Sequence, residues 1–160
     1  MELKTYEPHK SSIGGMDANV LALLVYVIAV IFNFIGGLHW FAWVVPLIFF
    51  YIEKDSQLVK FHAAQAFVLG VVSAIIYIIL DIISTAVAWS YVGNLLSGNA
   101  IGFFGGFWVI AIISIIVAVV LAIFEIIAMS NAYKYKEYNI PLIGGLAEKF
   151  KAMAGKNKAA

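Results

Sequence analysis

Residues 64–89 read AQAFVLGVVSAIIYIILDIISTAVAW, a stretch of 26 positions whose only Asp, Glu, Lys or Arg is Asp81. As a helix this stretch is about 39 Å long, which exceeds the hydrocarbon core of a bilayer, about 30 Å thick. Residues 103–129 follow an uncharged connection and repeat the pattern, with Glu125 as their only charged residue. These two segments predict a pair of membrane-spanning helices.

Two shorter apolar stretches precede this pair. Residues 18–35 and 38–52 contain no charged side chain, and the whole chain has 64% hydrophobic and 12% charged residues. That is too little polar surface for a water-soluble globule of this length. The second stretch gives only about 22 Å of helix, so we expect it to thin the bilayer locally or to kink at Pro46, with a re-entrant segment as the alternative. The predicted fold class is all-α, a polytopic membrane protein with four transmembrane helices that span about residues 18–35, 38–52, 64–89 and 103–129.

The ends of these segments carry typical helix-terminating residues. Asp17 is expected to cap the first helix, which Gly36 and Gly37 end. Residues 92–102 are rich in Gly, Asn and Ser and predict an uncharged outer loop.

The basic residues orient the protein in the membrane. All ten are lysines, and they lie in three of the five segments that flank the predicted spans, as Lys4, Lys10, Lys54, Lys60, Lys134, Lys136, Lys149, Lys151, Lys156 and Lys158. Because basic residues beside membrane spans remain in the cytoplasm, this alternation predicts a multi-pass protein of the cell membrane with both termini inside. Residues 1–16 are then a cytoplasmic N-terminal tail, residues 17–133 the transmembrane domain and residues 134–160 a cytoplasmic C-terminal tail.

The C-terminal tail contains an amphipathic pattern. After Pro141, apolar residues recur at spacings of three, four and three as Ile143, Leu146, Phe150 and Met153, and the lysines lie off this stripe. The pattern predicts an amphipathic helix that lies on the membrane surface. A tail that becomes ordered only against a partner is the alternative.

Small and polar residues recur at steps of three or four on the two long spans and so share one face of each helix. On the third span they are Ala66, Gly70, Ser73, Tyr77, Asp81 and Ser84, and on the fourth Ala111, Ser114, Ala118, Ala122 and Glu125. Because small side chains let helix backbones approach closely in lipid, we expect the two helices to pack through these faces.

Asp81 and Glu125 are the candidate functional residues inside the membrane, because an ionisable group there costs at least about 2.5 kcal/mol and usually serves a function. Tyr77 and Ser114 are candidate hydrogen-bond partners of Asp81. Three interpretations stay open: a protonated carboxyl group that links two helices, a proton or cation pathway, and contact with a partner subunit.

Several classes of function find no support in the sequence. The chain has no Cys, and therefore no disulfide, thiolate metal site or cysteine nucleophile. It shows no nucleophile with a base, no metal-ligand spacing and no phosphate-binding loop. A net charge of +1 gives no reason to expect a nucleic-acid partner. We therefore expect no enzymatic activity, cofactor or metal.

Three short segments go beyond general membrane patterning. They are Glu53-Lys54-Asp55, Phe61-His62-Ala63-Ala64-Gln65-Ala66 and Ile140-Pro141-Leu142-Ile143-Gly144. Together they resemble the family of small four-helix membrane proteins related to the chloroplast inner-envelope import component Tic-twenty, which includes the MamF-type magnetosome membrane proteins. The resemblance covers about residues 17–150. It implies a four-helix fold with both termini in the cytoplasm, in a family whose prokaryotic members mostly have no assigned function.

Lys60, Phe61, His62 and Gln65 form a candidate site where the third helix enters the membrane. His62 and Gln65 lie three residues apart and can hydrogen-bond to the start of the C-terminal segment or to Glu125. Lys60 can extend to the lipid headgroups. Two interpretations have equal support: a docking or lipid-headgroup site, and a structural clamp.

The leading functional hypothesis is a non-enzymatic accessory or scaffold subunit of a larger membrane protein complex. Its expected partners are the lipid bilayer and other membrane subunits or further copies of the chain, because the loops are short and the apolar helix faces must be covered. The second hypothesis is an oligomeric channel or proton-coupled carrier that uses Asp81 and Glu125. The third, by family analogy alone, is a component of protein insertion or translocation.

Overall fold

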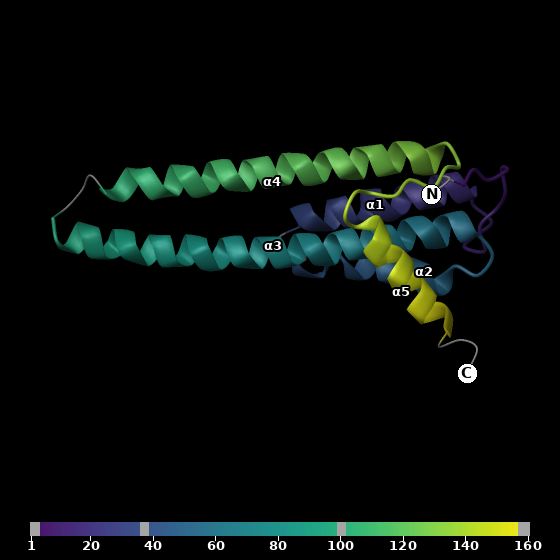
Figure 1. The fold of residues 1–160 in the computed structure, drawn as a ribbon, viewed down its shortest axis with the longest axis horizontal. Coiled ribbons are helices and arrows are strands. Elements are labelled where there is room, and N and C mark those ends of the chain that lie inside the picture. The colour runs from purple at the N-terminus through teal and green to yellow at the C-terminus, as the bar shows by residue number, and fades with distance from the viewer. Residues whose placement is uncertain (1–3, 36–38, 99–101, 157–160) are drawn as a thin grey trace. The chain divides into compact units, whose positions relative to one another are not determined.

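The structure is a computed structural model that describes residues 4–35, 39–98 and 102–156. Its elements are α1 (Ala18–Phe34), η1 (His39–Phe41, one turn of 3₁₀-helix), α2 (Val44–Ile52), α3 (Gln57–Leu96), α4 (Gly102–Tyr133) and α5 (Gly144–Lys156) (Figure 1). Over these ranges the chain forms helices and no strand, which confirms the predicted all-α class. The roles expected of Gly36 and Gly37, of residues 99–101 in the outer loop and of Lys158 concern residues outside the described ranges.

The chain divides into two compact units. Unit 1 comprises Met1–Val72 and Phe124–Ala160, and therefore contains α1, α2, the first part of α3, the last part of α4, and α5. Unit 2 comprises Ser73–Ile123, the remaining parts of α3 and α4. α3 is continuous from one unit to the other and extends to Leu96, so it includes residues that the sequence assigned to the outer loop.

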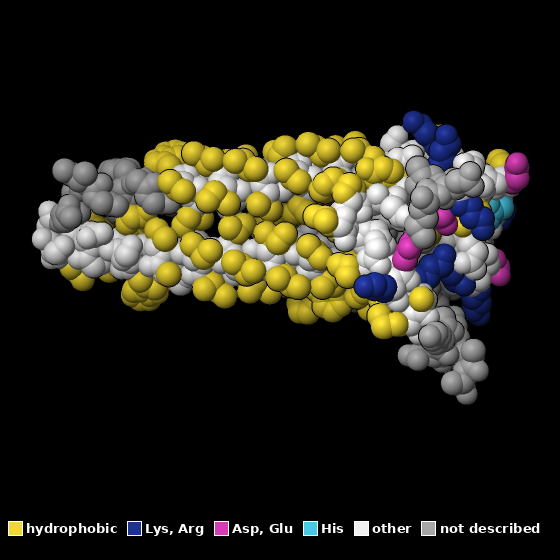
Figure 2. Space-filling model, viewed as in Figure 1, with side chains coloured by type: hydrophobic (Ala, Val, Ile, Leu, Met, Phe, Trp, Pro, Cys, Tyr) yellow, Lys and Arg dark blue, Asp and Glu magenta, His cyan; other side chains and the backbone are white. Residues whose placement is uncertain are grey.

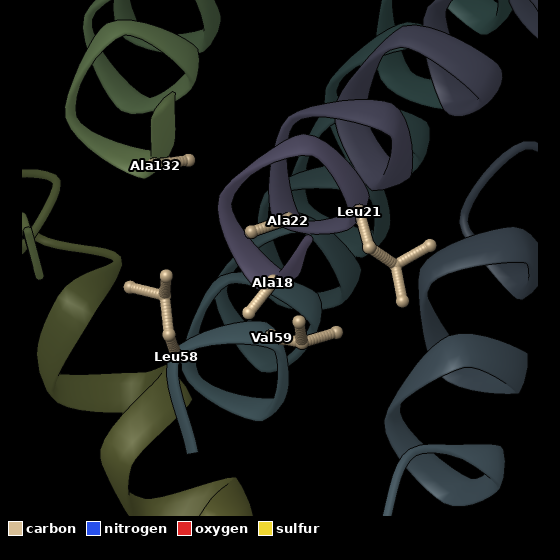
Figure 3. Packing of buried hydrophobic residues seen from close by; sticks show 6 residues of the cluster. All are labelled: Ala18, Leu21, Ala22, Leu58, Val59 and Ala132. Carbon is tan, nitrogen blue, oxygen red and sulfur yellow. The ribbon is translucent and has the colours of Figure 1, made fainter. Parts of the chain in front are cut away.

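The core of unit 1 is formed where α1 packs against the start of α3 and the end of α4. The buried side chains of this cluster are Ala18, Leu21, Ala22, Leu58, Val59 and Ala132 (Figure 3). Figure 3 shows the Leu58 side chain pointing into the space between α1 and the end of α4, where the small Ala22 and Ala132 leave room for it. Leu58 is completely buried, which contributes about 2 kcal/mol of hydrophobic stabilisation.

α1 begins directly after Asp17, as the sequence predicts, but the expected capping hydrogen bond does not stabilise its start. Asp17 occupies the N-cap position in an extended conformation, but its side chain makes no capping hydrogen bond. Its carboxylate instead forms an ion pair of 2.8 Å with Lys10, and the Ala18 N–H donates to the His9 carbonyl at 3.0 Å. The N-terminal segment therefore supplies the interactions at the start of α1.

The second apolar stretch forms a shorter helix than the sequence predicts. α2 has nine residues and begins at Val44, after η1, so its length is about 14 Å, less than half of a hydrocarbon core. Pro46 lies in the first turn, where a backbone N–H has no partner within the helix, so the proline causes no kink. An added Cβ on Gly70 of α3 would lie 2.9 Å from the Trp43 Cβ. Gly70 thus allows α3 to approach the start of α2, and not α4 as expected from the small-residue face.

Within unit 1, α5 packs against α2 and α3 through one part of its predicted apolar stripe. Ile143 and Ala147 are buried, and the Phe150 ring lies 5.1 Å from the Phe50 ring of α2 and 4.7 Å from the Phe67 ring of α3. Leu146 and Met153 are 50% and 62% exposed, so the four predicted residues do not share one environment. The buried face of α5 is rotated towards Ala147.

Unit 2 presents a mostly apolar surface. Its large exposed side chains include Ile75, Ile79, Ile82, Ile83, Trp89, Trp108, Ile112, Ile115, Ile116 and Val119, and Figure 2 shows hydrophobic side chains over the visible face of both helices. On α4, Ser114, Val117 and Leu121 are half-buried, whereas Ala118 is exposed. Ala111 and Ser114 of the predicted small-residue face are thus half-buried, whereas Val117 and Leu121 are half-buried in place of Ala118 and Ala122.

Two of the described helices, α3 and the Trp108–Tyr133 part of α4, are long and apolar enough to cross a membrane. The apolar helix Ala18–Asn33 is shorter than this criterion.

Candidate functional site

The polar side chains of unit 1 gather in a region that we call the polar cap: residues 4–17, the α2–α3 connection 53–56, and residues 134–140. Figure 2 shows Lys, Asp, Glu and His side chains concentrated at one end of this unit. The polar cap joins three segments that are far apart in the sequence. Its contacts, and the side chains directly beneath it, form the candidate site.

Glu53 is the centre of the polar cap. Its side chain is completely buried. Its carboxylate accepts hydrogen bonds from the Ser11 hydroxyl, from the Ser12 hydroxyl at 2.9 Å and N–H at 3.1 Å, and from the N–H groups of Asp55 and Ser56 at 2.9 Å each. These donors replace the water that a carboxylate loses on burial. Glu53 therefore ties the N-terminal segment to the α2–α3 connection.

The environment of Glu53 favours its charged form. Burial by itself raises the pKa of this carboxyl group, but hydrogen bonds from Ser11, Ser56 and Ser12 outweigh it and lower the pKa from 4.5 to about 2. Glu53 is thus ionised at neutral pH, and its charge contributes to folding, not to proton exchange.

The start of α3 is capped within the same network. Ser56 precedes the helix, and its hydroxyl oxygen accepts a hydrogen bond from the Val59 N–H at 3.2 Å, as an N-cap serine does. The Ser56 hydroxyl also shares a hydrogen bond of 2.8 Å with His9 Nε2. His9 Nδ1 lies 2.8 Å from the Glu7 carbonyl and must donate to it. In a neutral His9, Nε2 therefore accepts a hydrogen bond from the Ser56 hydroxyl.

The two ends of the polar cap pair with each other. Thr5 and Lys136 form an antiparallel bridge, flanked by hydrogen bonds from the Tyr6 N–H to the Tyr135 carbonyl and from the Glu137 N–H to the Lys4 carbonyl, each 2.9 Å. The Tyr6 hydroxyl donates to the Glu137 carboxylate at 2.7 Å. Burial, together with this hydrogen bond and the nearby charge, raises the pKa of Tyr6, so the phenol remains protonated well into the alkaline range.

Beneath the polar cap lies a chain of buried polar side chains. His62 Nε2 lies 3.0 Å from the Lys136 carbonyl and must donate to it, so in the neutral ring Nδ1 accepts the Tyr26 hydroxyl proton at 3.2 Å. His62 is completely buried and Tyr26 is 2% exposed. The structure thus places His62, one of the predicted site residues, against the start of the C-terminal segment.

Gln65 and Glu125 are two further polar side chains of unit 1. Gln65 is completely buried, and within the described part of the chain neither atom of its amide group has a hydrogen-bond partner of good geometry. Glu125 is half-buried on α4. Because the Tyr26 hydroxyl donates its hydrogen bond to His62, its oxygen can still accept a hydrogen bond from an amide or from a protonated carboxyl group.

The other predicted residues have separate environments. Phe61 is buried, and its ring lies 5.2 Å from the His62 ring. The Lys60 ammonium donates to the Lys54 carbonyl at 2.7 Å. Asp81 is exposed on α3 in unit 2, and across residues 4–35, 39–98 and 102–156 it makes no hydrogen bond or ion pair with Tyr77, Ser114 or any other group.

Sequence reasoning gave no structural role to the two anchors of this region, although Glu53 lies in a segment that carries the family resemblance. Ser56 directly before an apolar helix is a recognisable N-cap signal. The contact of Glu53 with Ser11 and Ser12 spans more than 40 residues and has no local signal. Tyr26 was missed because a tyrosine in an apolar span also fits the lipid interface.

The arrangement provides hydrogen bonding and charge burial. Among the described residues no three His, Asp or Glu side chains are grouped as a metal site would require. His9 and His62 each donate a hydrogen bond to a backbone carbonyl group, and a carbonyl group does not take up the proton.

Comparisons with known proteins identify the relatives of this chain as membrane proteins. The family model of the magnetosome magnetite crystal formation proteins, MamF/MmsF, matches residues 17–147. Two similar proteins of Methanocaldococcus jannaschii are the UPF0132 membrane proteins MJ1443 and MJ1527, each 26% identical. The matches cover 85% of this chain in both cases, and 90% and 71% of the relatives. No solved structure matches the chain. The match over most of its length shows that the chain belongs to the MamF/MmsF family of membrane proteins.

Proposed function

We propose that this chain is a non-enzymatic membrane protein that serves as an accessory or scaffold subunit of a larger membrane protein complex. Asp81 is the observation that supports the proposal. It lies in a helix of 40 residues that is apolar enough to cross a membrane, between exposed side chains such as Ile79 and Ile82. A second membrane protein, or another copy of the chain, is the partner that this position needs.

The energetic argument concerns lipid exposure. A carboxyl group that faces lipid near the middle of a span costs about 2.5 kcal/mol or more, so such groups normally face a protein interior or a partner. Within the described residues Asp81 has no partner. A donor from a neighbouring helix would remove this cost, and in lipid such a hydrogen bond contributes on the order of 1 kcal/mol to helix association.

Native mass spectrometry of the endogenously expressed protein, extracted in a mild detergent, tests the proposal. We expect a stoichiometric complex, which Asp81→Leu weakens and Asp81→Asn preserves, because asparagine keeps hydrogen-bonding capacity. Ser90→Leu, an exposed position on the opposite side of α3, is the matched control. A wild-type protein that is always isolated alone, without companion subunits, would contradict the proposal.

A channel or proton-coupled carrier is the second candidate. Glu125, half-buried in the same unit as the hydrogen-bonded pair Tyr26 and His62, favours it, because ionisable groups inside a membrane span often mark proton pathways. Proton flux into liposomes distinguishes the candidates. A carrier loses flux in Asp81→Asn and Glu125→Gln, whereas a scaffold shows no flux above that of empty liposomes.

We further propose that the chain crosses the cell membrane four times with both termini in the cytoplasm. The lysine distribution supports this topology. The second crossing needs the test most, because α2 has nine residues and is short for a membrane span. Because the chain has no Cys, single substitutions Ser12→Cys and Ser97→Cys can be labelled with an impermeant thiol reagent in intact cells. Only position 97 should react from outside.

A role in protein insertion rests on the resemblance to the Tic-twenty-related proteins and ranks third. The name of the matched family refers to magnetite crystal formation. This chain contains no run of acidic residues that would suit mineral contact. We therefore do not extend that activity to it.

A further inference from the structure

Leu142 protrudes from a tight turn that precedes α5. The Ile140 carbonyl accepts hydrogen bonds from the Ile143 N–H at 3.2 Å and from the Gly144 N–H at 2.8 Å, and Ile140 and Ile143 are both buried. Leu142 between them has a φ of 67° and is 95% exposed. This left-handed conformation is unfavourable for a leucine and persists only where the surrounding structure imposes it. The turn therefore holds a large apolar side chain away from the protein.

α5 continues the exposed surface that begins at Leu142. Its inward side carries Ala147, which is buried, and Phe150, which contacts two other aromatic rings. Leu146 and Met153 are seven positions apart, a spacing of two helical turns that places both on one side of α5. They are 50% and 62% exposed. We call Leu142, Leu146 and Met153 the apolar edge.

The aromatic contacts of α5 indicate its depth relative to a bilayer. The Phe150 ring lies 4.7 Å from the Phe67 ring of α3. Phe67 is the fourth residue of the apolar stretch 64–89, in a helix long and apolar enough to cross a membrane. Because the hydrocarbon region begins near the start of such a stretch, its boundary lies at the level of α5. The apolar edge is therefore within reach of lipid.

The charges of α5 suit the headgroups of an anionic membrane surface. The helix contains Lys149, Lys151 and Lys156 against one acidic residue, Glu148. Lys149 is exposed three positions after Leu146, so its carbon chain can lie along the apolar surface while its ammonium group reaches a phosphate. An excess of lysines beside exposed apolar residues is typical of helices that lie in the membrane interface. Contact with the same edge of a second copy would instead bring like charges together.

We propose that the apolar edge inserts into the bilayer surface on the side of the polar cap, with Leu142, Leu146 and Met153 among the acyl chains just below the headgroups. Lipid then covers the side chains that unit 1 leaves exposed, and this contact stabilises the left-handed turn. The face that meets lipid differs from the stripe that periodicity predicts, because Ile143 and Phe150 are held by protein. α5 is thus bound on two sides, to α2 and α3 and to lipid. This inference is independent of the proposed subunit function.

Site-directed spin labelling tests the proposal, because the chain has no Cys and each single variant carries one label. Leu142→Cys, Leu146→Cys and Met153→Cys are labelled in the full-length protein, in nanodiscs of phosphatidylcholine and phosphatidylglycerol. Oxygen concentrates in the hydrocarbon region, whereas a neutral nickel chelate remains in water. The ratio of their collision rates with a label therefore reports lipid contact. We expect labels at all three positions to collide more often with oxygen than with the chelate.

Two control positions calibrate this ratio. Ile115→Cys, at a position of α4 that is 62% exposed within the apolar stretch 103–129, gives the value for lipid. Asp55→Cys, exposed in the polar cap, gives the value for water. Labels on the apolar edge that match Asp55→Cys would overturn the proposal, since α5 would then face water. Labels protected from both reagents would overturn it in favour of a protein partner. An unchanged melting temperature shows that each labelled variant retains the fold.

Discussion

Replacement of Glu53 by Gln should destabilise the protein in a strongly pH-dependent manner. The variant has nearly the same shape but has no charge, and its amide NH₂ group faces donors that require an acceptor. The Ser11 and Ser12 hydroxyl groups and three backbone N–H groups surround this position. At least one of these donors therefore loses its partner.

The magnitude follows from the pKa. A carboxyl group with a pKa of about 2 in the folded protein and 4.5 when unfolded contributes roughly 3 kcal/mol to folding at neutral pH. Because the folded pKa is the lower one, this contribution is complete above a pH of about 4.5 and disappears as the pH falls towards about 2. Glu53→Gln should therefore be about 3 kcal/mol less stable than the wild type at neutral pH, and the gap should narrow steadily in acid.

The assay is thermal unfolding of the full-length protein in nanodiscs over a series of pH values. Asp55→Asn is the matched control, because Asp55 lies two residues away but is exposed. It should unfold like the wild type at every pH. A gap between Glu53→Gln and the wild type that stays constant from neutral pH to acid would refute the reasoning, since the effect would then come from shape and not from charge.

Three further changes test other contacts in unit 1 by the same unfolding assay. Gly70→Ala should cost about 1–3 kcal/mol, because its Cβ would lie 2.9 Å from the Trp43 Cβ and 3.1 Å from its Cα; Gly93→Ala, which has open space in the same helix, should be neutral or slightly stabilising. Tyr6→Phe removes the hydrogen bond to Glu137 and should cost about 1 kcal/mol, and an unchanged melting temperature would argue against that bond. The double variant of Tyr26→Phe and His62→Leu should lose about 1 kcal/mol less free energy of unfolding than the two single variants lose together, because they share one hydrogen bond. Losses that add up would show that the two side chains are not coupled.

Local patterns predicted the helices more accurately than their contacts. The long apolar runs of α3 and α4 follow from hydropathy alone, because a helix satisfies its backbone hydrogen bonds within the segment. Periodicity could not assign the inward faces. Small residues mark where helices can approach closely, but Gly70 meets Trp43, and the larger Val117 occupies the inward side of α4.

The candidate site shows the same limit. His62 and Gln65 attract notice as polar residues in an apolar helix, and His62 indeed contacts the C-terminal segment. Glu53 resembles an ordinary charged loop residue until Ser11 is brought beside it, 42 positions away in the chain. Long-range contacts of this kind depend on how the whole chain folds, and no spacing within a short window encodes them.

The pairing between residues 4–6 and residues 135–137 imposes an order on biosynthesis. The Glu53 network can close once residue 56 has left the ribosome, because all its members precede that point. The bridge from Thr5 to Lys136 must wait until α4 has been synthesised and inserted. The first residues made therefore complete their contacts among the last, so a chain that stalls before α4 is complete would display an unpaired N-terminal segment as a mark of unfinished assembly.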